Sequence, residues 1–322
     1  MKKLFLSAAL LAASLASQAQ QAPLWMRYPA ISPDGKTIVF SYKGDIYSVP
    51  ATGGEARQLT TNAAHDSYPV WSPDGKKIAF ASNREGSFDV YVMPAHGGTP
   101  TRITTNSERE IPVAFKDNDH VLFSANIMPT AESNLFASRE FSQVYEVSTQ
   151  GGRPKLYSGI PMEDISINAK GQVLYHDSKG YEDQWRKHHT SPITRDIWML
   201  DNGKYQKITA FKGEDRTPVW AADGESFYYL SEQAGSFNIY HRNIATGKDV
   251  QLTHEKKNPI RFLTSSADGL LCYGYDGEIY TVKEGAQPQK VNISITADND
   301  EPSLVRQVRS WGATEIALSP DA

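Results

Sequence analysis

A short pattern of one polar, one β-branched and one aromatic residue recurs along the chain. Successive copies lie 40 to 54 residues apart. Alternation of this kind indicates strands, and a repeat of this length is typical of the blades of a β-propeller. The copies are Asp45-Ile46-Tyr47, Asp89-Val90-Tyr91, Gln143-Val144-Tyr145, Asp196-Ile197-Trp198, Asn238-Ile239-Tyr240 and Glu278-Ile279-Tyr280.

The second repeat shows how one blade is expected to form. Between its first two strands, Ser72-Pro73-Asp74-Gly75 predicts a tight turn, because proline presets φ and glycine accepts a positive φ. Four short antiparallel strands per repeat predict an all-β fold, a six-bladed β-propeller with four strands in each blade. The strands expected in this repeat are residues 68–71, 77–81, 89–93 and 101–104.

An aromatic residue closes the second strand of every repeat. Because the ring recurs at the same position, we expect it to form core between neighbouring blades rather than a platform for a ligand. The six rings are Phe40, Phe80, Phe123, Tyr175, Tyr229 and Tyr273.

The chain divides into three predicted segments. Residues 1–19 have the basic start, short apolar run and small-residue site of a secretion signal cleaved near Ala19, which predicts an exported, periplasmic protein. Residues 22–293 form the propeller. Each blade runs from an inner to an outer strand, so we expect side-chain packing, without strand exchange, to close the ring. Residues 294–322 predict a linker and the truncated start of a second propeller, so we expect the natural chain to continue.

Composition excludes several classes of protein. Loss of Lys2 and Lys3 with the signal leaves 31 basic against 37 acidic residues, and this mild acidic excess argues against nucleic acid as a partner. No stretch after the signal reaches the roughly 20 apolar residues of a membrane span. Cys272 is the only cysteine, so the chain can form no internal disulfide.

Charged residues in the predicted inner strands are candidates for the lining of the axial channel. Because side chains alternate along a strand, their direction is uncertain by one residue. They are interpreted either as ordinary solvated charges or as a filter for the backbone and termini of a peptide. The candidates are Arg27, Asp66, Glu110, Asp164, Arg216 and Arg261.

Two repeats carry long insertions, residues 124–140 and 176–195, and long loops in compact repeats are often functional. The second insertion holds candidates for partner contact. A metal site from His176, Asp177 and one of the two adjacent histidines is disfavoured, because no known zinc spacing is present. We expect no metal and no cofactor. The contact candidates are Trp185, Arg186, His188 and His189.

No catalytic motif is found. The sequence lacks a Gly-x-Ser-x-Gly elbow, a His-Glu-x-x-His pair and a glycine-rich phosphate loop. We therefore expect no catalytic residue in this segment, and any enzyme activity would lie beyond Ala322.

The chain resembles the amino-terminal propeller of exported tricorn-type peptidases. Two features carry the resemblance besides the Ser-Pro-Asp-Gly turns: the insertion from Tyr181 to Trp198 and the restart of the pattern at Ile316 to Asp321. The resemblance implies a six-bladed propeller followed by a seven-bladed one, a PDZ-like domain and a serine-peptidase core. It implies that this segment gates or supports a peptidase that degrades oligopeptides. Its partners would be peptides or protein substrates and the downstream domains of the same chain, with a homo-oligomer left open.

Two alternatives remain. The first is a stand-alone periplasmic module resembling the TolB propeller, which would act as a protein-binding adaptor. The second is the propeller of a prolyl-oligopeptidase-like enzyme, which the six clean repeats disfavour because those propellers generally have seven or eight blades.

Overall fold

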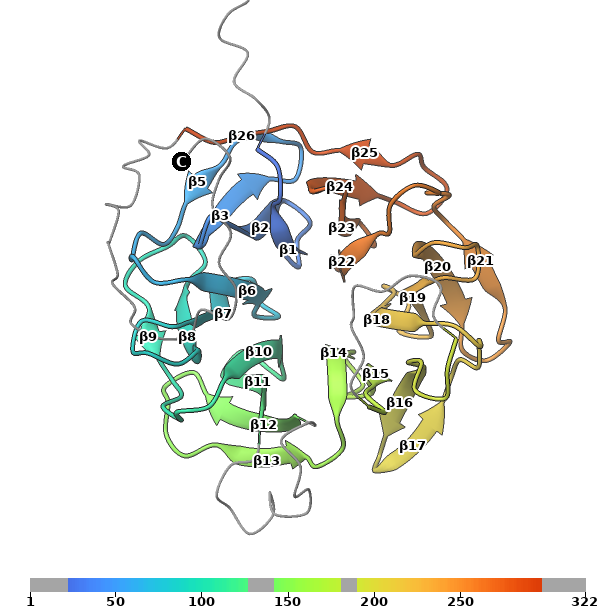
Figure 1. The fold of residues 1–322 in the computed structure, drawn as a ribbon, viewed down its shortest axis with the longest axis horizontal. Helices are drawn as coiled ribbons and strands as arrows, with labels where there is room; N and C mark the ends of the chain where they lie inside the picture. The colour runs from blue at the N-terminus through green and yellow to red at the C-terminus, as the bar shows by residue number, and fades with distance from the viewer. Residues whose placement is uncertain (1–22, 127–141, 181–189, 297–322) are drawn as a thin grey trace, which may run out of the picture.

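Six four-stranded antiparallel sheets surround a central axis in the computed structural model of the chain (Figure 1). The structure describes residues 23–126, 142–180 and 190–296. Every regular element within these ranges is a strand, and no helix occurs there. Accordingly, none of these residues belongs to a helix long and apolar enough to cross a membrane. The prediction of an all-β, six-bladed propeller is confirmed.

Each blade is one continuous stretch of chain that runs from an inner strand at the axis to an outer strand at the rim. The first blade consists of β1 (Arg27–Ile31), β2 (Thr37–Tyr42), β3 (Asp45–Pro50) and β5 (Arg57–Gln58). The second consists of β6 (Asp66–Trp71), β7 (Lys77–Ser82), β8 (Asp89–Pro94) and β9 (Thr101–Arg102). The third consists of β10 (Glu110–Phe115), β11 (His120–Ala125), β12 (Gln143–Ser148) and β13 (Lys155–Ser158).

The remaining blades follow the same order of strands. The fourth consists of β14 (Met162–Ile167), β15 (Val173–Asp177), β16 (Ile197–Asp201) and β17 (Lys204–Lys207). The fifth consists of β18 (Asp215–Trp220), β19 (Ser226–Ser231), β20 (Asn238–Asn243) and β21 (Asp249–Gln251). The sixth consists of β22 (Arg261–Ser265), β23 (Leu271–Tyr275), β24 (Glu278–Val282) and β25 (Gln289–Lys290).

The turn between the first two strands of a blade is closed by its own side chains. In the first blade, the Ser32 hydroxyl donates to Asp34 Oδ1 at 2.6 Å and accepts the Thr37 N–H at 3.0 Å. Gly35 donates its N–H to the Ser32 carbonyl at 2.9 Å with φ at +71°, a conformation that a residue with a Cβ rarely adopts. The Ser-Pro-Asp-Gly pattern therefore forms the tight turn that the sequence predicted.

The core lies between blades. Six clusters of buried apolar side chains occur among the described residues, and each joins two neighbouring blades. The recurring rings of the second strands belong to this core and pair across strands with the aromatic residue of the third; Phe80 and Tyr91, for example, stack with centroids 5.9 Å apart. The prediction that these rings form core between blades is confirmed. All six are almost fully buried: Phe40, Phe80, Phe123, Tyr175, Tyr229 and Tyr273.

In the first and fifth repeats, a threonine hydroxyl binds the polar residue that precedes the β-branched one. In the fifth blade, the Thr253 hydroxyl accepts the Ile239 N–H at 2.9 Å and donates to Asn238 Oδ1 at 3.0 Å. The hydroxyl thus ties the start of the third strand to the segment that follows the fourth. The same bond to the third strand is made at 2.9 Å by Thr60, Thr104 and Thr209.

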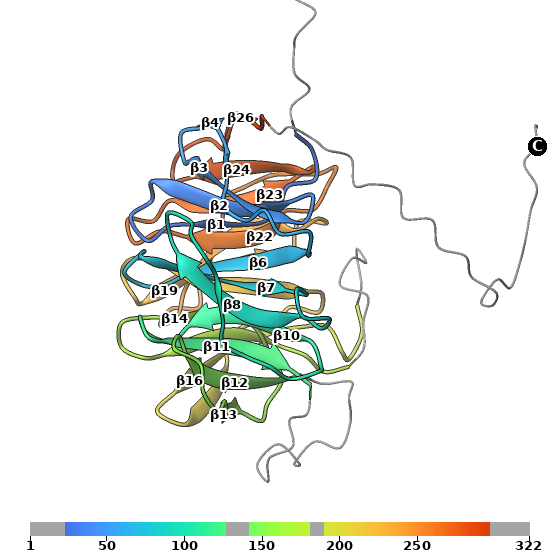
Figure 2. The same cartoon turned by 90° about the vertical axis from the view of Figure 1, so that its left-hand side faces the viewer.

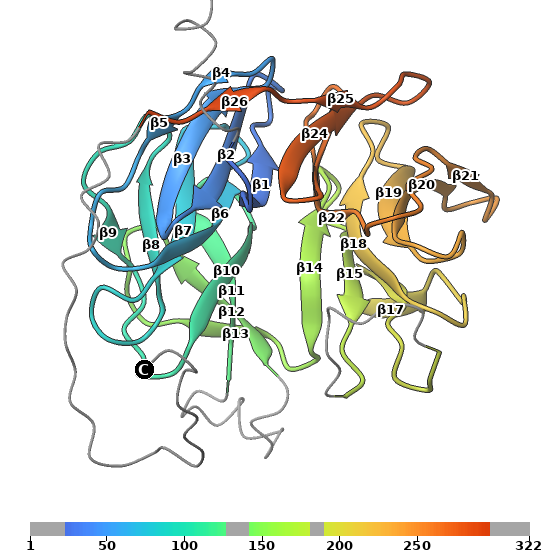
Figure 3. The same ribbon diagram turned by 45° about the horizontal axis from the view of Figure 1, so that its top comes forward.

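The ring closes partly through backbone hydrogen bonds. After the sixth blade the chain crosses to the first, where β26 (Ile293–Ser294) pairs in parallel with β4 (Gly54–Glu55) (Figure 3). Gly54 donates its N–H to the Asn292 carbonyl at 2.9 Å, and Ala56 donates to the Ser294 carbonyl at 2.8 Å. The side view in Figure 2 shows the two short strands together at one end of the molecule. The expectation that side-chain packing alone closes the ring is wrong, although no strand is exchanged between the four-stranded sheets.

Candidate functional site

A bulge interrupts the inner strand of every blade. Pairing with the second strand skips the same two residues in five sheets, and in the third blade it skips only the second of them, Val113. In five blades the residue at this bulge has a left-handed backbone, with φ between 49° and 60°. A bulky or β-branched side chain there costs about 1–3 kcal/mol, and such residues concentrate at ligand sites. The five residues are Tyr28, Tyr68, Asp164, Thr217 and Phe262.

The third blade departs from this rule because Pro112 occupies the equivalent position. The ring of a proline holds φ near −65°, so the left-handed conformation is closed to it. Pro112 still pairs with Phe123, and the shift in register falls after it, before Ala114. The bulge is thus a property of the blade, whereas its backbone conformation depends on the residue that the bulge carries.

The six bulge positions line one cavity of about 790 Å³, enclosed by the inner strands. Its two sides differ in chemistry. We call Tyr28, Tyr68 and Phe262, from the first, second and sixth blades, the aromatic wall. The acidic wall, from the fourth and fifth blades, consists of Glu163, Asp164, His176 and Thr217.

In the aromatic wall, Tyr28 stacks on Tyr68 and meets Phe262 edge to face. Tyr28 lies 4.0 Å from Tyr68 and 4.8 Å from Phe262, measured between ring centroids. The Tyr28 and Tyr68 hydroxyls are joined by a hydrogen bond of 2.9 Å. Burial and this hydrogen bond raise the pKa of Tyr28, so its phenol stays protonated. Arg109 lies over the Tyr68 ring at 5.6 Å and donates to the Tyr68 hydroxyl at 3.1 Å.

The acidic wall is organised by a histidine. His176 Nε2 lies 3.1 Å from Glu163 Oε2, and His176 Nδ1 lies 3.3 Å from the Thr217 N–H that it accepts. Burial would raise the pKa of Glu163, but the hydrogen bond from His176 and the positive charges nearby, that of Arg195 among them, lower it to about 2. Thr217 also donates its hydroxyl to Asp164 Oδ2 at 2.6 Å. The Glu163 carboxylate therefore stays ionised at this side of the cavity.

The six charged candidates for the channel lining lie at three different positions of the inner strand. Asp164 is at the bulge and lines the cavity, and Arg216 and Arg261, one residue before the bulge, line it as well. Arg27, also one residue before the bulge, is exposed at the start of β1 and is outside the cavity lining. Asp66 and Glu110 lie two residues before it and are buried.

The buried carboxylates interact within a blade or between neighbouring blades. Asp66 is paired with Arg84 at 2.6 Å. Burial, with a smaller contribution from Asp89 of the preceding blade, raises the pKa of Glu110 to about 7. Burial likewise raises the pKa of Asp215, the equivalent residue of the fifth blade, to about 7, with Asp196 adding to the effect. Glu110 and Asp215 therefore make the stability of the fold depend on pH.

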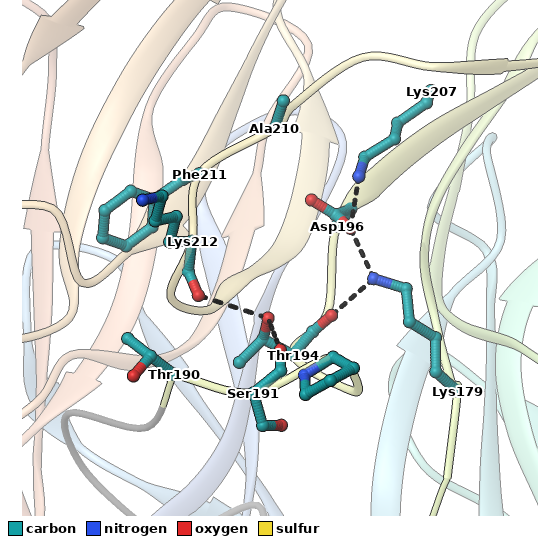
Figure 4. Close-up of a pocket in the computed structure, with 10 residues that line it drawn as sticks. Lys179, Thr190, Ser191, Thr194, Asp196, Lys207, Ala210, Phe211 and Lys212 are labelled. Carbon is teal, nitrogen blue, oxygen red and sulfur yellow. Dashed lines mark hydrogen bonds and ion pairs between the residues drawn. The ribbon is translucent and has the colours of Figure 1, made fainter.

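The candidates Trp185, Arg186, His188 and His189 lie outside the described residues. A second cavity, of about 370 Å³, is lined by Lys179, Asp196 and Lys207 among others (Figure 4). Both lysines pair with the Asp196 carboxylate, Lys207 at 2.8 Å, and Lys179 also pairs with Asp177 at 3.5 Å, so their charges are compensated within the chain. Among the described residues, no group of three His, Cys, Asp or Glu side chains is placed to hold a metal ion.

Sequence reasoning missed the aromatic wall and Thr217. The signal that could have located them is proline within the inner strand, because proline in a strand marks an edge or a bulge. The bulge residue immediately precedes a proline in three blades, and in a fourth the proline is itself the bulge residue. The four are Pro29, Pro69, Pro218 and Pro112.

Comparison with known families finds one match. The family described as the tricorn protease N-terminal beta propeller domain matches residues 23–288. A search of curated proteins found no match.

Solved structures show the same fold. The crystal structure of the tricorn protease has 19% identity and a TM-score of 0.69, and the match covers 84% of this chain and 26% of that one. TolB from Acinetobacter baumannii has 18% identity and a TM-score of 0.57, covering 80% of this chain and 61% of that one. The propeller of the Trilobed protease from Pyrococcus furiosus, described as having an open velcro topology, has 12% identity and a TM-score of 0.53, covering 86% of each chain.

Proposed function

Because the chain belongs to the family of tricorn protease N-terminal beta propeller domains, we propose that it forms the non-catalytic gating and scaffold propeller of an exported serine peptidase that degrades oligopeptides. The observation that carries the proposal is the family match. It covers all six blades except β25, the outer strand of the sixth blade. The chain spans about a quarter of the tricorn protease chain, 26%. The peptidase activity is therefore assigned to the longer protein and not to this segment.

The cavity supports the gating role. Its volume of about 790 Å³ lies within the range of about 300–1,000 Å³ typical of small-molecule sites. Its lining combines rings, carboxylates and arginines, which suit the side chains and termini of a short peptide. A folded protein is too large for such a space. The size of the cavity would thus allow oligopeptides, but not folded proteins, to pass through the channel.

Export is part of the proposal. It is supported by the charged, apolar and small-residue order of residues 1–19 and by the single cysteine, whose buried side chain makes the thiol unsuited to pairing. Expression of the tagged protein followed by fractionation and amino-terminal sequencing would test it. We expect the mature chain in the periplasm to begin at Gln20. An uncleaved chain in the cytoplasm would contradict export.

The catalytic assignment is tested by assaying this chain and the longer protein on the same peptides. We expect cleavage by the longer protein alone. Hydrolysis by the purified 322-residue chain would overturn the assignment, because no catalytic residue is proposed here.

The gating role is tested by blocking the cavity in the longer protein. Thr217→Cys places a thiol in the lining, and Cys272 should not react because its side chain is buried. We expect a bulky maleimide on this thiol to slow cleavage of tetrapeptides to octapeptides and to spare a small chromogenic amide. Asp276→Cys, outside the cavity lining, is the labelling control. Equal rates for both labelled proteins on peptides would argue against gating.

The alternative is a stand-alone adaptor resembling TolB, favoured by the likeness to the Acinetobacter baumannii structure. The two proposals predict different coding regions after Ala322. A second propeller and a peptidase core support gating, whereas an early stop codon supports the adaptor.

A further inference from the structure

We propose that the channel cavity binds short peptides with both ends free, with the amino terminus at Asp164 and the carboxylate terminus at Arg109. An aromatic side chain of the ligand would stack on the aromatic wall. The inference deepens the proposed gating function, on which it rests for the nature of the ligand. It names the chemistry and the direction in which a peptide lies across the channel.

Asp164 is the carboxylate of the acidic wall that is left for a ligand. Its side chain is 49% exposed, and its left-handed backbone belongs to the bulge that lines the cavity. Oδ2 accepts the Thr217 hydroxyl, whereas Oδ1 has no hydrogen bond to the described part of the chain. An ammonium group at Oδ1 would gain a charge-assisted hydrogen bond without displacing an existing partner.

The neighbouring groups do not compete for this role. Glu163 is already held by His176 at 3.1 Å and by Arg195 at 3.6 Å. Both ring nitrogens of His176 already have partners, because Nδ1 accepts the Thr217 N–H and Nε2 lies 3.1 Å from Glu163 Oε2. The distance from Nδ1 to Asp164 Oδ2 is 3.6 Å, too long for a hydrogen bond, so His176 leaves the Asp164 carboxylate open to a ligand.

Arg109 supplies the opposite charge beside the aromatic wall. Its guanidinium lies over the rings of Tyr68 and Phe88, at 5.6 and 5.7 Å from their centroids. Stacking on ring faces leaves the edge of the planar guanidinium to bind a carboxylate with two parallel hydrogen bonds. None of the ion pairs within residues 23–126, 142–180 and 190–296 involves Arg109.

The arrangement of the blades separates these two charges. In a ring of six, the first blade faces the fourth across the axis, so β1, which carries Tyr28, lies opposite β14, which carries Asp164 (Figure 1). Arg109 precedes the third blade and sits on the aromatic side. A ligand that satisfies both must carry an amine and a carboxylate separated by a short chain, as a short unblocked peptide does.

Binding of the tripeptide Ala-Ala-Phe, whose ring lies at the carboxylate end that faces the aromatic wall, to the 322-residue chain tests the inference by titration calorimetry. The acetylated and the amidated forms of the same peptide test each end separately. We expect each cap to weaken binding about tenfold, the loss of one charge-assisted contact. Equal affinities for the free, acetylated and amidated peptides, or no binding of any of them, would overturn the proposal.

Two variants test which residue binds each terminus of the peptide. Asp164→Asn removes the charge and keeps the backbone, because asparagine tolerates the left-handed region. We expect it to abolish the effect of acetylation and to keep that of amidation. Arg109→Gln should do the reverse. The opposite pattern, or an unchanged response of both variants to both caps, would overturn the assignment.

Each variant has a matched control outside the cavity lining. Asp276 is exposed and also has a left-handed backbone, with φ at +52°, so Asp276→Asn repeats the same chemical change. Arg153 is exposed between β12 and β13, so Arg153→Gln controls for loss of a positive charge. We expect both controls to bind all three peptides as the parent chain does. Weakening by the controls equal to that of the cavity variants would show a nonspecific charge effect and overturn the proposal.

These outcomes are separate from those of the proposed function. The binding experiment needs no peptidase core, whereas the blocked-channel experiment needs no preference for free termini. Peptide binding that does not depend on the end groups would contradict the inference but not the proposed gating function. Recognition of the end groups together with unchanged cleavage by the labelled longer protein would contradict gating but not the peptide site.

Discussion

The interior of the blades and the wall of the channel obey different rules in this protein. In the interior, the same ring and the same apolar neighbours recur in six sheets, because every blade packs against a nearly identical one. At the bulge of the inner strand, by contrast, the six residues range from tyrosine to aspartate. Repetition therefore supports the fold, and departure from repetition makes the two walls of the cavity chemically different. Four predictions test this division.

The largest effect is expected in the interior, from Phe80→Ala. The ring is fully buried and stacks on Tyr91 in the core between the first two blades. Its removal should lower the free energy of unfolding by about 3–5 kcal/mol. Denaturation in urea measures the change, and Tyr205→Ala, at a position 45% exposed on an outer strand, should cost far less. Equal losses would mean that the rings between blades do not hold the fold.

Dependence on pH is expected from the carboxyls between blades. Burial raises the pKa of Glu110 from 4.5 to about 7, so its contribution to stability is full below about pH 4.5 and is lost as the pH rises through 7. The loss is on the order of 3 kcal/mol. Asp215 acts in the same direction.

Unfolding of the parent chain and of Glu110→Gln at pH 5 and pH 8 measures this contribution. The neutral amide should flatten the dependence on pH, whereas Glu55→Gln, at an exposed position, should leave it unchanged. A parent chain that is more stable at pH 8 than at pH 5 would contradict the assignment.

A smaller effect is expected from Thr253→Val, which keeps the shape of the side chain and removes the hydroxyl. The Ile239 N–H then loses its acceptor in a buried position, at a cost of about 1–2 kcal/mol. Thermal unfolding at constant pH measures the loss. Thr101→Val, on the exposed side of an outer strand, is the control and should shift the midpoint little.

The smallest effect on stability is expected at the channel wall. Asp164→Asn should change the free energy of unfolding by about 0.5 kcal/mol or less, because the side chain is half exposed and asparagine keeps the backbone conformation. Its effect should be confined to ligand binding. Urea denaturation measures this effect. A loss of stability as large as that expected for Phe80→Ala would mean that the channel wall also supports the fold.

Most of the fold could be predicted from the sequence because its determinants are local and repeated. A turn such as residues 32–35 is closed by hydrogen bonds among neighbours in the chain, and each copy of the repeat confirms the reading of the others. Closure of the ring was misjudged, since the pairing of Ser294 with Glu55 joins segments far apart in sequence. Such a contact leaves no periodic signal.

The candidate site was predicted only in outline. Polar inner strands were expected, and Asp164 was named among them, but Tyr28, Tyr68, Phe262 and Thr217 were not. The reason is the bulge, which changes the side to which each later residue points. A strand with a bulge cannot be read by alternation unless the position of the bulge is known.

By itself, then, the sequence determined the number of blades, the turns, the rings between sheets and the relation to a family of propellers, because each of these depends on neighbours or on repetition. Only the tertiary structure decided which side chains share the cavity, that its two sides differ in charge and ring content, and how the last segment reaches the first blade. Those features depend on the backbone at six bulges and on the order of blades around an axis, which no local pattern encodes.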